Sequence, residues 1–168
     1  MKLFSLIAFT TIFIVLSAIP ALTQDKSSPA EVLAMTRKAA DYIASIGKKG
    51  LEEFNDPQSR WVVKDTYVFV INCEQGTIVS HPFSQKLRGK KLLGLTDIKG
   101  NLFFVDFCEA AKKPMGGWTE YWWNKPGEKK PSRKISVVLQ VPDMPYQVGA
   151  GIYDDKLPVQ QLQKLLNQ

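Results

Sequence analysis

The chain has 168 residues, of which 45% are hydrophobic, 11% aromatic and 23% charged, and its formal net charge is +6. This composition excludes a disordered or collagen-like chain and a protein with several membrane spans, and the length suits one domain with its own core. The lysines are spread along the chain in pairs, so the basic charge does not indicate nucleic-acid binding.

The first 23 residues have the pattern of a secretory signal peptide. Lys2 precedes an apolar run that carries no charge before Asp25, and small residues such as Ala18 and Ala21 lie near its end. An uncleaved membrane anchor is the alternative, because about 20 apolar residues can span a bilayer. Either interpretation places residues 24–168, a single domain, in the periplasm or outside the cell.

A long helix is predicted over residues 29–54. Ser28 supplies a capping hydroxyl, Pro29 suits the first turn, and Glu31 completes a capping box. Asn55-Asp56-Pro57 ends the helix. Apolar residues recur at helical steps and form one stripe: Val32, Met35, Ala39, Tyr42, Ile43 and Ile46.

After Pro57 the apolar pattern changes to a period of two, which indicates strands. The predicted strands are 61–63, 67–72, 76–80, 117–124, 134–141 and 147–153, with helices at 102–111 and 156–167. The second and third strands form a hairpin through Glu74-Gln75-Gly76. This order predicts an α+β domain whose long N-terminal helix packs on a central antiparallel sheet of five or six strands.

The chain has two cysteines, Cys73 and Cys108. In an exported protein an even pair predicts a disulfide, and two buried free thiols are the alternative. With a single histidine, the two cysteines lack the spacing of a zinc site, so no metal is expected.

His81 is the one histidine, so it is the one possible centre of an imidazole-dependent enzyme. Ser80 precedes it, but adjacent strand residues point to opposite faces, and neither a GxSxG nor an HExxH motif occurs. We therefore expect no enzyme, and an exported hydrolase centred on His81 is retained as a minor alternative. A structural, hydrogen-bonded histidine is the commoner role in such a position.

Four aromatic residues lie between Trp118 and Trp123. Alternation sends Tyr121 and Trp123 to one face of the strand and Trp118 and Trp122 to the other. One face belongs to the core, whereas the other is exposed or lines a ligand pocket. Lys134, in the next strand, can reach the Tyr121 face as a cation; an exposed lysine at a strand end is the alternative.

Several motifs in order resemble the single Cache domain, an extracytoplasmic small-molecule sensor module of bacterial receptors. They are EQGTIVSHP (74–82), LRG (87–89), Thr96-Asp97 with Gly100, GGWTEYWWNKPGEKKPSRK (116–134) and GAGIYDD (149–155). The resemblance covers about residues 29–165. It implies a Cache/PAS-like fold with a ligand cavity between one face of the sheet and the loops and helices above it.

By the same resemblance, the domain takes up a short organic acid. Tyr121, Trp123, Lys134 and His81 match motif positions of the pocket, and Tyr67, with Trp61, is carried over on weaker grounds. No cofactor is implied.

Because the chain stops at Gln168, we read it as a stand-alone binding module that needs a membrane-bound signalling or transport partner. A homodimer through helix 29–54 is a further expectation. A subunit that docks a partner protein through the aromatic strand is the main alternative function.

Overall fold

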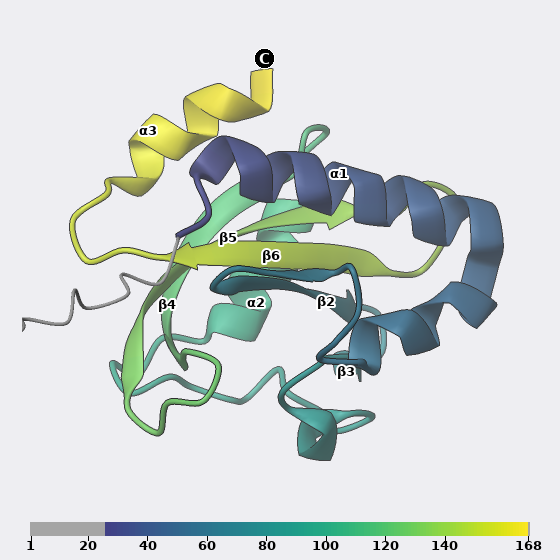
Figure 1. Ribbon diagram of the computed structural model, residues 1–168, viewed down its shortest axis with the longest axis horizontal. Helices are drawn as coiled ribbons and strands as arrows, with labels where there is room; N and C mark the ends of the chain where they lie inside the picture. Colours follow the sequence, from purple (N-terminus) through teal and green to yellow (C-terminus); the bar gives the residue numbers. More distant parts are fainter. Residues whose placement is uncertain (1–25, 168) are drawn as a thin grey trace, which may run out of the picture.

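The computed structural model describes residues 26–167; the predicted signal peptide or anchor lies outside these residues. The chain forms a six-stranded antiparallel sheet with helices on both faces, as predicted (Figure 1). None of the helices among residues 26–167 is long and apolar enough to cross a membrane. The α-helices are α1 (Pro29–Ile46), α2 (Phe103–Ala111) and α3 (Val159–Gln163). The strands are β1 (Val62–Val63), β2 (Thr66–Asn72), β3 (Thr77–Ser80), β4 (Gly117–Asn124), β5 (Pro131–Gln140) and β6 (Gln147–Tyr153).

Helix α1 begins as the sequence predicts. Ser28 and Glu31 form a reciprocal capping box, with Pro29 in the first turn. The α-helix ends at Ile46, because Gly47 adopts a positive φ of 72°, and a 3-10 helix, Gly47–Asn55, continues to the predicted end. The expected long or kinked helix is therefore two helices joined at Gly47.

The strand order is β1-β2-β6-β5-β4, and β3 pairs with the free part of β2. The predicted hairpin of β2 and β3 is confirmed. Strand β5 begins at Pro131, three residues earlier than expected, so Lys134 lies inside the strand instead of at its end. The last predicted helix is shorter, because α3 starts at Val159 and passes into a 3-10 helix, Lys164–Asn167.

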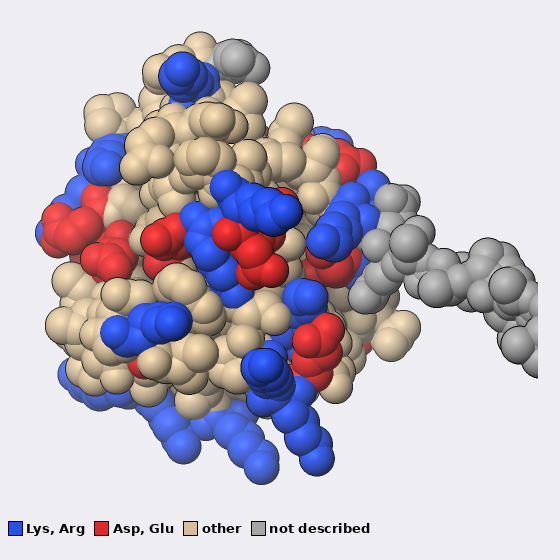
Figure 2. All heavy atoms as spheres, turned by 90° about the vertical axis from the view of Figure 1, so that its left-hand side faces the viewer, with Lys and Arg blue, Asp and Glu red and all other residues tan. Residues whose placement is uncertain are grey.

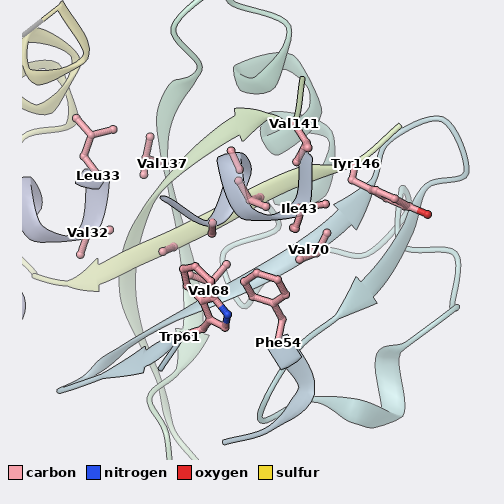
Figure 3. Close-up of a cluster of buried hydrophobic side chains, with 14 of the residues drawn as sticks. Val32, Leu33, Ile43, Phe54, Trp61, Val68, Val70, Val137, Val141 and Tyr146 are labelled. Atoms are coloured by element: carbon pink, nitrogen blue, oxygen red, sulfur yellow. The ribbon is translucent and has the colours of Figure 1, made fainter. Parts of the chain in front are cut away.

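Each strand divides its side chains between two buried clusters. The α1 face is packed mainly by aliphatic residues from α1, α3 and the sheet, with Phe54 and Trp61 at one end (Figure 3). The opposite face, covered by α2 and the loops around it, is lined mainly by aromatic residues. We call this second side of the sheet the site face, because the predicted site residues that the structure brings together lie there.

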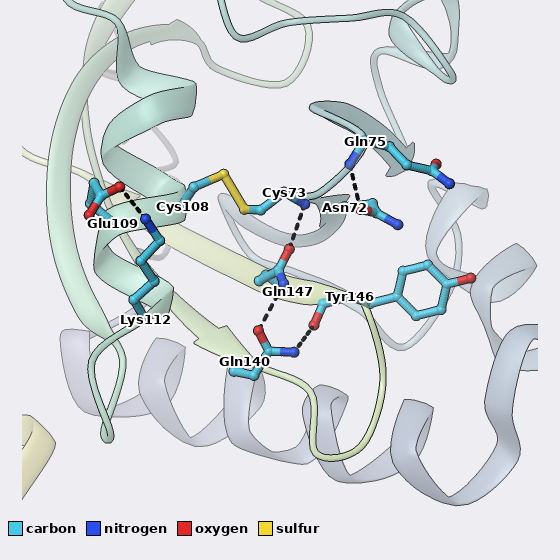
Figure 4. Close-up of a disulfide and its surroundings, with 9 residues drawn as sticks. All are labelled: Asn72, Cys73, Gln75, Cys108, Glu109, Lys112, Gln140, Tyr146 and Gln147. Carbon is cyan, nitrogen blue, oxygen red and sulfur yellow. Dashed lines mark hydrogen bonds and ion pairs between the residues drawn. A yellow bond between two sulfur atoms is a disulfide. The ribbon is translucent and has the colours of Figure 1, made fainter.

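Cys73 and Cys108 are joined by a disulfide, as predicted, with their Cα atoms 5.6 Å apart (Figure 4). The bond ties α2 to the end of β2. Beside it, the backbone N–H of Cys73 donates to Gln147 Oε1, and Gln147 in turn donates to Gln140 (Figure 4). The disulfide and this chain of hydrogen bonds hold one edge of the cover over the site face.

Candidate functional site

Three strands and one loop bring the predicted site residues together. Tyr67 comes from β2, Tyr121 and Trp123 from β4, Lys134 from β5, and His81 from the loop after β3. Strand alternation puts all the strand residues on the site face, as predicted for β4. Tyr121 lies directly opposite Lys134 in the β4–β5 ladder, and Lys134 lies opposite Tyr153 of β6.

Lys134 is the centre of this cluster. Its side chain is completely buried, and its Nζ makes no hydrogen bond to any residue in the described part of the chain. The Nζ lies 3.7 Å from the centroid of the Tyr67 ring and 5.0 Å from that of Tyr153. Burial lowers the pKa of the Lys134 ammonium well below its usual value, although the charge of Asp65 opposes this. A buried cation that meets only ring faces is suited to pair with an anion.

Glycines of β6 form the floor beneath Lys134. A Cβ on Gly151 would lie 2.2 Å from Ser136 Oγ and 3.0 Å from Lys134 Cε, so only glycine leaves space for these side chains to cross the strand. Gly149, two residues earlier on the same face, has the ring of Phe69 above it. The G-x-G-x-Y part of the closing motif thus shapes the site with its backbone.

The tyrosines supply neutral hydroxyls. Burial raises the pKa of Tyr67, Tyr121 and Tyr153, so these groups stay protonated at neutral pH. Tyr121 shares a hydrogen bond of 3.2 Å with Ser136, and Tyr153 donates to the backbone carbonyl of Asn124 at 2.7 Å. The phenols therefore offer hydrogen-bonding groups without adding charge.

His81 is both a structural residue and a member of the site. Its Nδ1 accepts hydrogen bonds from the backbone N–H groups of Phe83 and Ser84, at 3.1 and 3.0 Å. Burial, aided by the charge of Lys134, lowers the pKa of His81 to about 3, so the ring is neutral and its proton is on Nε2. Its centroid lies 4.9 Å from that of Tyr67. The imidazole can thus donate one hydrogen bond from Nε2.

Ser80 does not pair with His81. Its hydroxyl donates to the carbonyl of Leu51 at 2.8 Å, on the α1 side. A serine–histidine nucleophile needs a hydrogen bond between the two side chains, and this geometry does not provide it.

Asp97 positions part of the cover over the site. Its carboxylate accepts hydrogen bonds from the backbone N–H of Trp122 and from Asn101, which fasten the loop before α2 to β4. Burial acts to raise the pKa of Asp97, but the hydrogen bonds lower it by more, so the pKa lies below its usual value. Phe103, at the start of α2, is thereby held over Tyr121, with ring centroids 5.1 Å apart.

Two cavities adjoin the cluster. An apolar cavity of about 20 Å³ lies between the sheet and α2, lined by rings that include Phe69, Phe103, Phe107 and Trp123. A recess of about 320 Å³ lies between the 83–87 and 124–128 loops, with Tyr67 and Trp123 in its wall. Trp123 borders both cavities, so it stands between the recess at the surface and the apolar cavity.

The turn at the recess carries more basic than acidic side chains. Lys125 and Glu128 line the recess and form an ion pair of 3.8 Å, and Lys129 and Lys130 are exposed on the same β4–β5 turn. This turn lies at the lower left of Figure 1, and Figure 2, which faces that side, shows Lys and Arg side chains projecting from the lower edge. Such a surface favours the approach of anions.

The structure corrects one predicted position and adds others. Trp61 is on the α1 face, stacked on Phe54 at 4.8 Å between centroids, so it is separated from the site by the sheet. Phe69, Tyr153 and the two β6 glycines are site residues that sequence reasoning missed. The GAGIYDD motif contained the signal for three of them, because alternation puts Gly149, Gly151 and Tyr153 on one face.

The aromatic strand is not an exposed docking surface. Trp118 is buried beneath α3, where Gln163 hydrogen-bonds both its backbone N–H and its carbonyl, and Tyr121 is 3% exposed. An interface requires apolar side chains at the surface. Trp122 and Trp123 are half-buried, but the buried rings of Trp118 and Tyr121 favour the pocket interpretation over partner docking.

Fold and site together define an extracytoplasmic ligand-sensing domain. The family model of the Cache domain matches residues 32–168, and the chain belongs to this family, as the sequence motifs predict. The relatives that it matches are larger proteins, and the match covers a part of each. The sensor histidine kinase MctS of Rhizobium johnstonii is 30% identical over 138 residues, 77% of this chain and 30% of that protein. The methyl-accepting chemotaxis protein McpP of Pseudomonas putida is 29% identical over 87 residues, 52% of this chain and 16% of that protein.

Solved structures of sensor domains have the same fold as this chain. A periplasmic sensor domain of a chemotaxis protein superposes with a TM-score of 0.60 at 28% identity, over 75% of this chain and 90% of that domain. A Cache chemosensory domain, described with the structural basis of carboxylic acid recognition, superposes with a TM-score of 0.59 at 22% identity, over 75% and 88%. The chain spans less than a third of the two curated relatives, so their kinase and chemotaxis activities are not attributed to it.

Proposed function

We propose that this domain binds a short carboxylic acid as its anion, with the carboxylate at Lys134, beside Tyr67 and His81, and the carbon chain directed toward the apolar cavity. The observation that carries the proposal is the buried Lys134 Nζ, which has no hydrogen-bond partner among residues 26–167. A carboxylate there gains more from the ammonium than it would in water, and it relieves the cost of the buried charge. His81 Nε2–H and the phenols supply neutral hydrogen bonds.

The relatives support this choice of ligand class. One solved domain of the same fold is described as recognising carboxylic acids. A ligand of four to six heavy atoms gains at most ~1.5 kcal/mol of binding free energy per atom. The dissociation constant is therefore no lower than tens of micromolar for about four atoms and sub-micromolar for about six.

Calorimetric titration of residues 24–168 with acetate and propionate, and with their neutral amides, tests the proposal. We expect the acids to bind and the amides not to bind, because only the acids pair with Lys134. Lys134→Met should weaken acid binding by about 10- to 100-fold, corresponding to ~1.5–3 kcal/mol. Lys125→Met, at the recess mouth, is the control and should change the affinity by less than three-fold. Amides that bind as well as the acids, or a Lys134→Met domain that binds acids normally, would contradict it.

For the whole protein, we propose a periplasmic or secreted location and a membrane-bound signalling or transport partner that reports ligand occupancy. The sensor histidine kinase and the chemotaxis protein among the relatives support this arrangement. We also propose dimerisation through α1. One face of this helix, together with Trp61, lines a surface groove of about 790 Å³, in which a second copy of the helix can pack. Light scattering that shows a monomer at high micromolar concentration would contradict a stable dimer.

A further inference from the structure

We propose that Phe69, seated on Gly149, sets the upper limit on the chain length of the acid; this inference rests on the proposed function. Phe69 is the side chain that faces both ends of the site. Its ring centroid lies 5.8 Å from Lys134 Nζ and 5.3 Å from that of Phe107, which lines the apolar cavity. An acid whose carboxylate pairs with Lys134 must extend its carbon chain past this ring.

The space beyond the ring is small. The apolar cavity holds about 20 Å³, enough for one group the size of a water molecule or a methyl. Rings from α2 and the sheet close it, and its lining is apolar and aromatic apart from polar atoms on side chains such as His81 and Tyr121. A tail of one carbon atom fits there, whereas a longer tail requires a wall to move.

Phe69 is a wall of the cavity whose position is fixed by a close contact with the neighbouring strand. It pairs directly with Gly149 in the β2–β6 ladder, and a Cβ on Gly149 would come within 2.3 Å of the Phe69 Cζ atom. Gly149 does not have a positive φ, so its backbone conformation does not call for glycine. The glycine instead lets the ring lie flat against the strand. Glycine at this position therefore determines how far Phe69 intrudes into the site.

Two variants should change the length limit in opposite directions. Phe69→Ala removes the ring and opens the cavity toward Lys134, so longer tails become buried. Each added methylene then gains up to about four-fold in affinity, and pentanoate gains up to about 15-fold relative to propionate. Gly149→Ala pushes the ring off the strand and into the site, so propionate should lose affinity relative to acetate.

The experiment is calorimetric titration of the wild-type domain and of both variants with unbranched acids of two to six carbons. Val70→Ala is the matched control: Val70 is the next residue of β2, is fully buried, and belongs to the α1 face. We expect it to leave the ratio of pentanoate to propionate affinity unchanged, although it also removes buried atoms. Phe69→Leu, a smaller change, repeats the test if Phe69→Ala fails to fold.

The outcomes separate this inference from the proposed function. A ratio that rises in Phe69→Ala or Phe69→Leu and stays constant in Val70→Ala supports the length limit. A wild-type domain that binds acids while folded Phe69 variants keep its length preference, or lose all acids equally, overturns the length limit alone. If no acid binds to the wild type or the variants, the proposed function falls and the length limit falls with it.

Discussion

The two faces of the sheet are made by alternate residues of the same strands, yet they differ in chemistry. On the α1 face, Ile135, Val137 and their neighbours interlock with aliphatic side chains of the helix. On the site face, the same strand presents Lys134 and Ser136, set among aromatic rings and β6 glycines. The first arrangement maximises burial of apolar surface, whereas the second buries a charge and small polar groups. The α1 face therefore serves packing alone, whereas the other face both packs and carries the site.

The largest effect is expected on the α1 face. Ile135 is completely buried there, so Ile135→Ala should lower the free energy of unfolding by ~2–5 kcal/mol through lost burial and the cavity left behind. Acid affinity of the folded variant should stay within two-fold of the wild type. Urea denaturation and calorimetry measure the two quantities. A large loss of acid affinity in a fully folded Ile135→Ala variant would show that the α1 face also influences acid binding.

The disulfide is the next largest contribution, and it acts on the site face. It closes a loop of 35 residues, so replacing both cysteines with serine should lower the free energy of unfolding by up to ~4 kcal/mol in the chain-entropy model. Because the bond holds α2 over the cavity, acid affinity should fall as well. Urea denaturation of the double variant, compared with Ile135→Ala, tests this contrast; unchanged acid binding would mean that α2 is held by packing alone.

His81 makes the site face sensitive to acid. Burial lowers the pKa of His81 to about 3, whereas it is ~6.5 in an unfolded chain, so below pH 6.5 the unfolded chain takes up a proton that the folded domain does not. Stability is thus lost as the pH falls from 6.5 toward 3. Between pH 7 and pH 4.5 the titration of His81 should lower the free energy of unfolding by about 2.5 kcal/mol.

His81→Asn is the matching variant. Its amide oxygen can replace Nδ1 as the acceptor for Phe83 and Ser84, and it does not titrate. The titratable groups facing His81, Lys134 and Tyr67, are kept. Urea denaturation at pH 7 and pH 4.5 should show that the free energy of unfolding falls less in the variant than in the wild type. Equal losses would assign the acid sensitivity to other groups.

The sequence predicted one face better than the other, for physical reasons. Periodicity located the helix stripe and the β4 alternation, because apolar burial leaves a repeating pattern. The family resemblance misplaced Trp61, and periodicity could not correct it, since β1 has only two residues and alternation cannot be followed through so short a strand. Periodicity missed the role of Gly149 and Gly151, because a glycine that makes space has no side chain to enter a pattern. Lys134 was predicted to be the first residue of its strand because the strand's polar start, residues 131–133, resembles a turn.

The smallest and sharpest effect is expected at Lys134, next to Ile135 on the same strand. Burial lowers the pKa of Lys134, so the unfolded chain, with a lysine pKa near ~10.4, binds a proton more firmly than the folded domain does. This difference lowers stability at neutral pH and is lost as the pH rises toward ~10. Lys134→Met should therefore raise the free energy of unfolding at pH 7 by ~1–3 kcal/mol, and the gain should shrink at pH 10.

Contact with the Tyr67 ring opposes this gain, since a desolvated ammonium over a ring contributes up to ~2 kcal/mol. Urea denaturation in the absence of acid decides which contribution is larger, with Lys125→Met as a control that should change stability by less than ~0.5 kcal/mol. If Lys134→Met is less stable than the wild type, the aromatic rings alone compensate the charge, and the site does not depend on a carboxylate to do so. If it is more stable while its acid binding is lost, adjacent residues of one strand have opposite effects: Ile135 stabilises the fold, and Lys134 lowers stability in order to bind the acid.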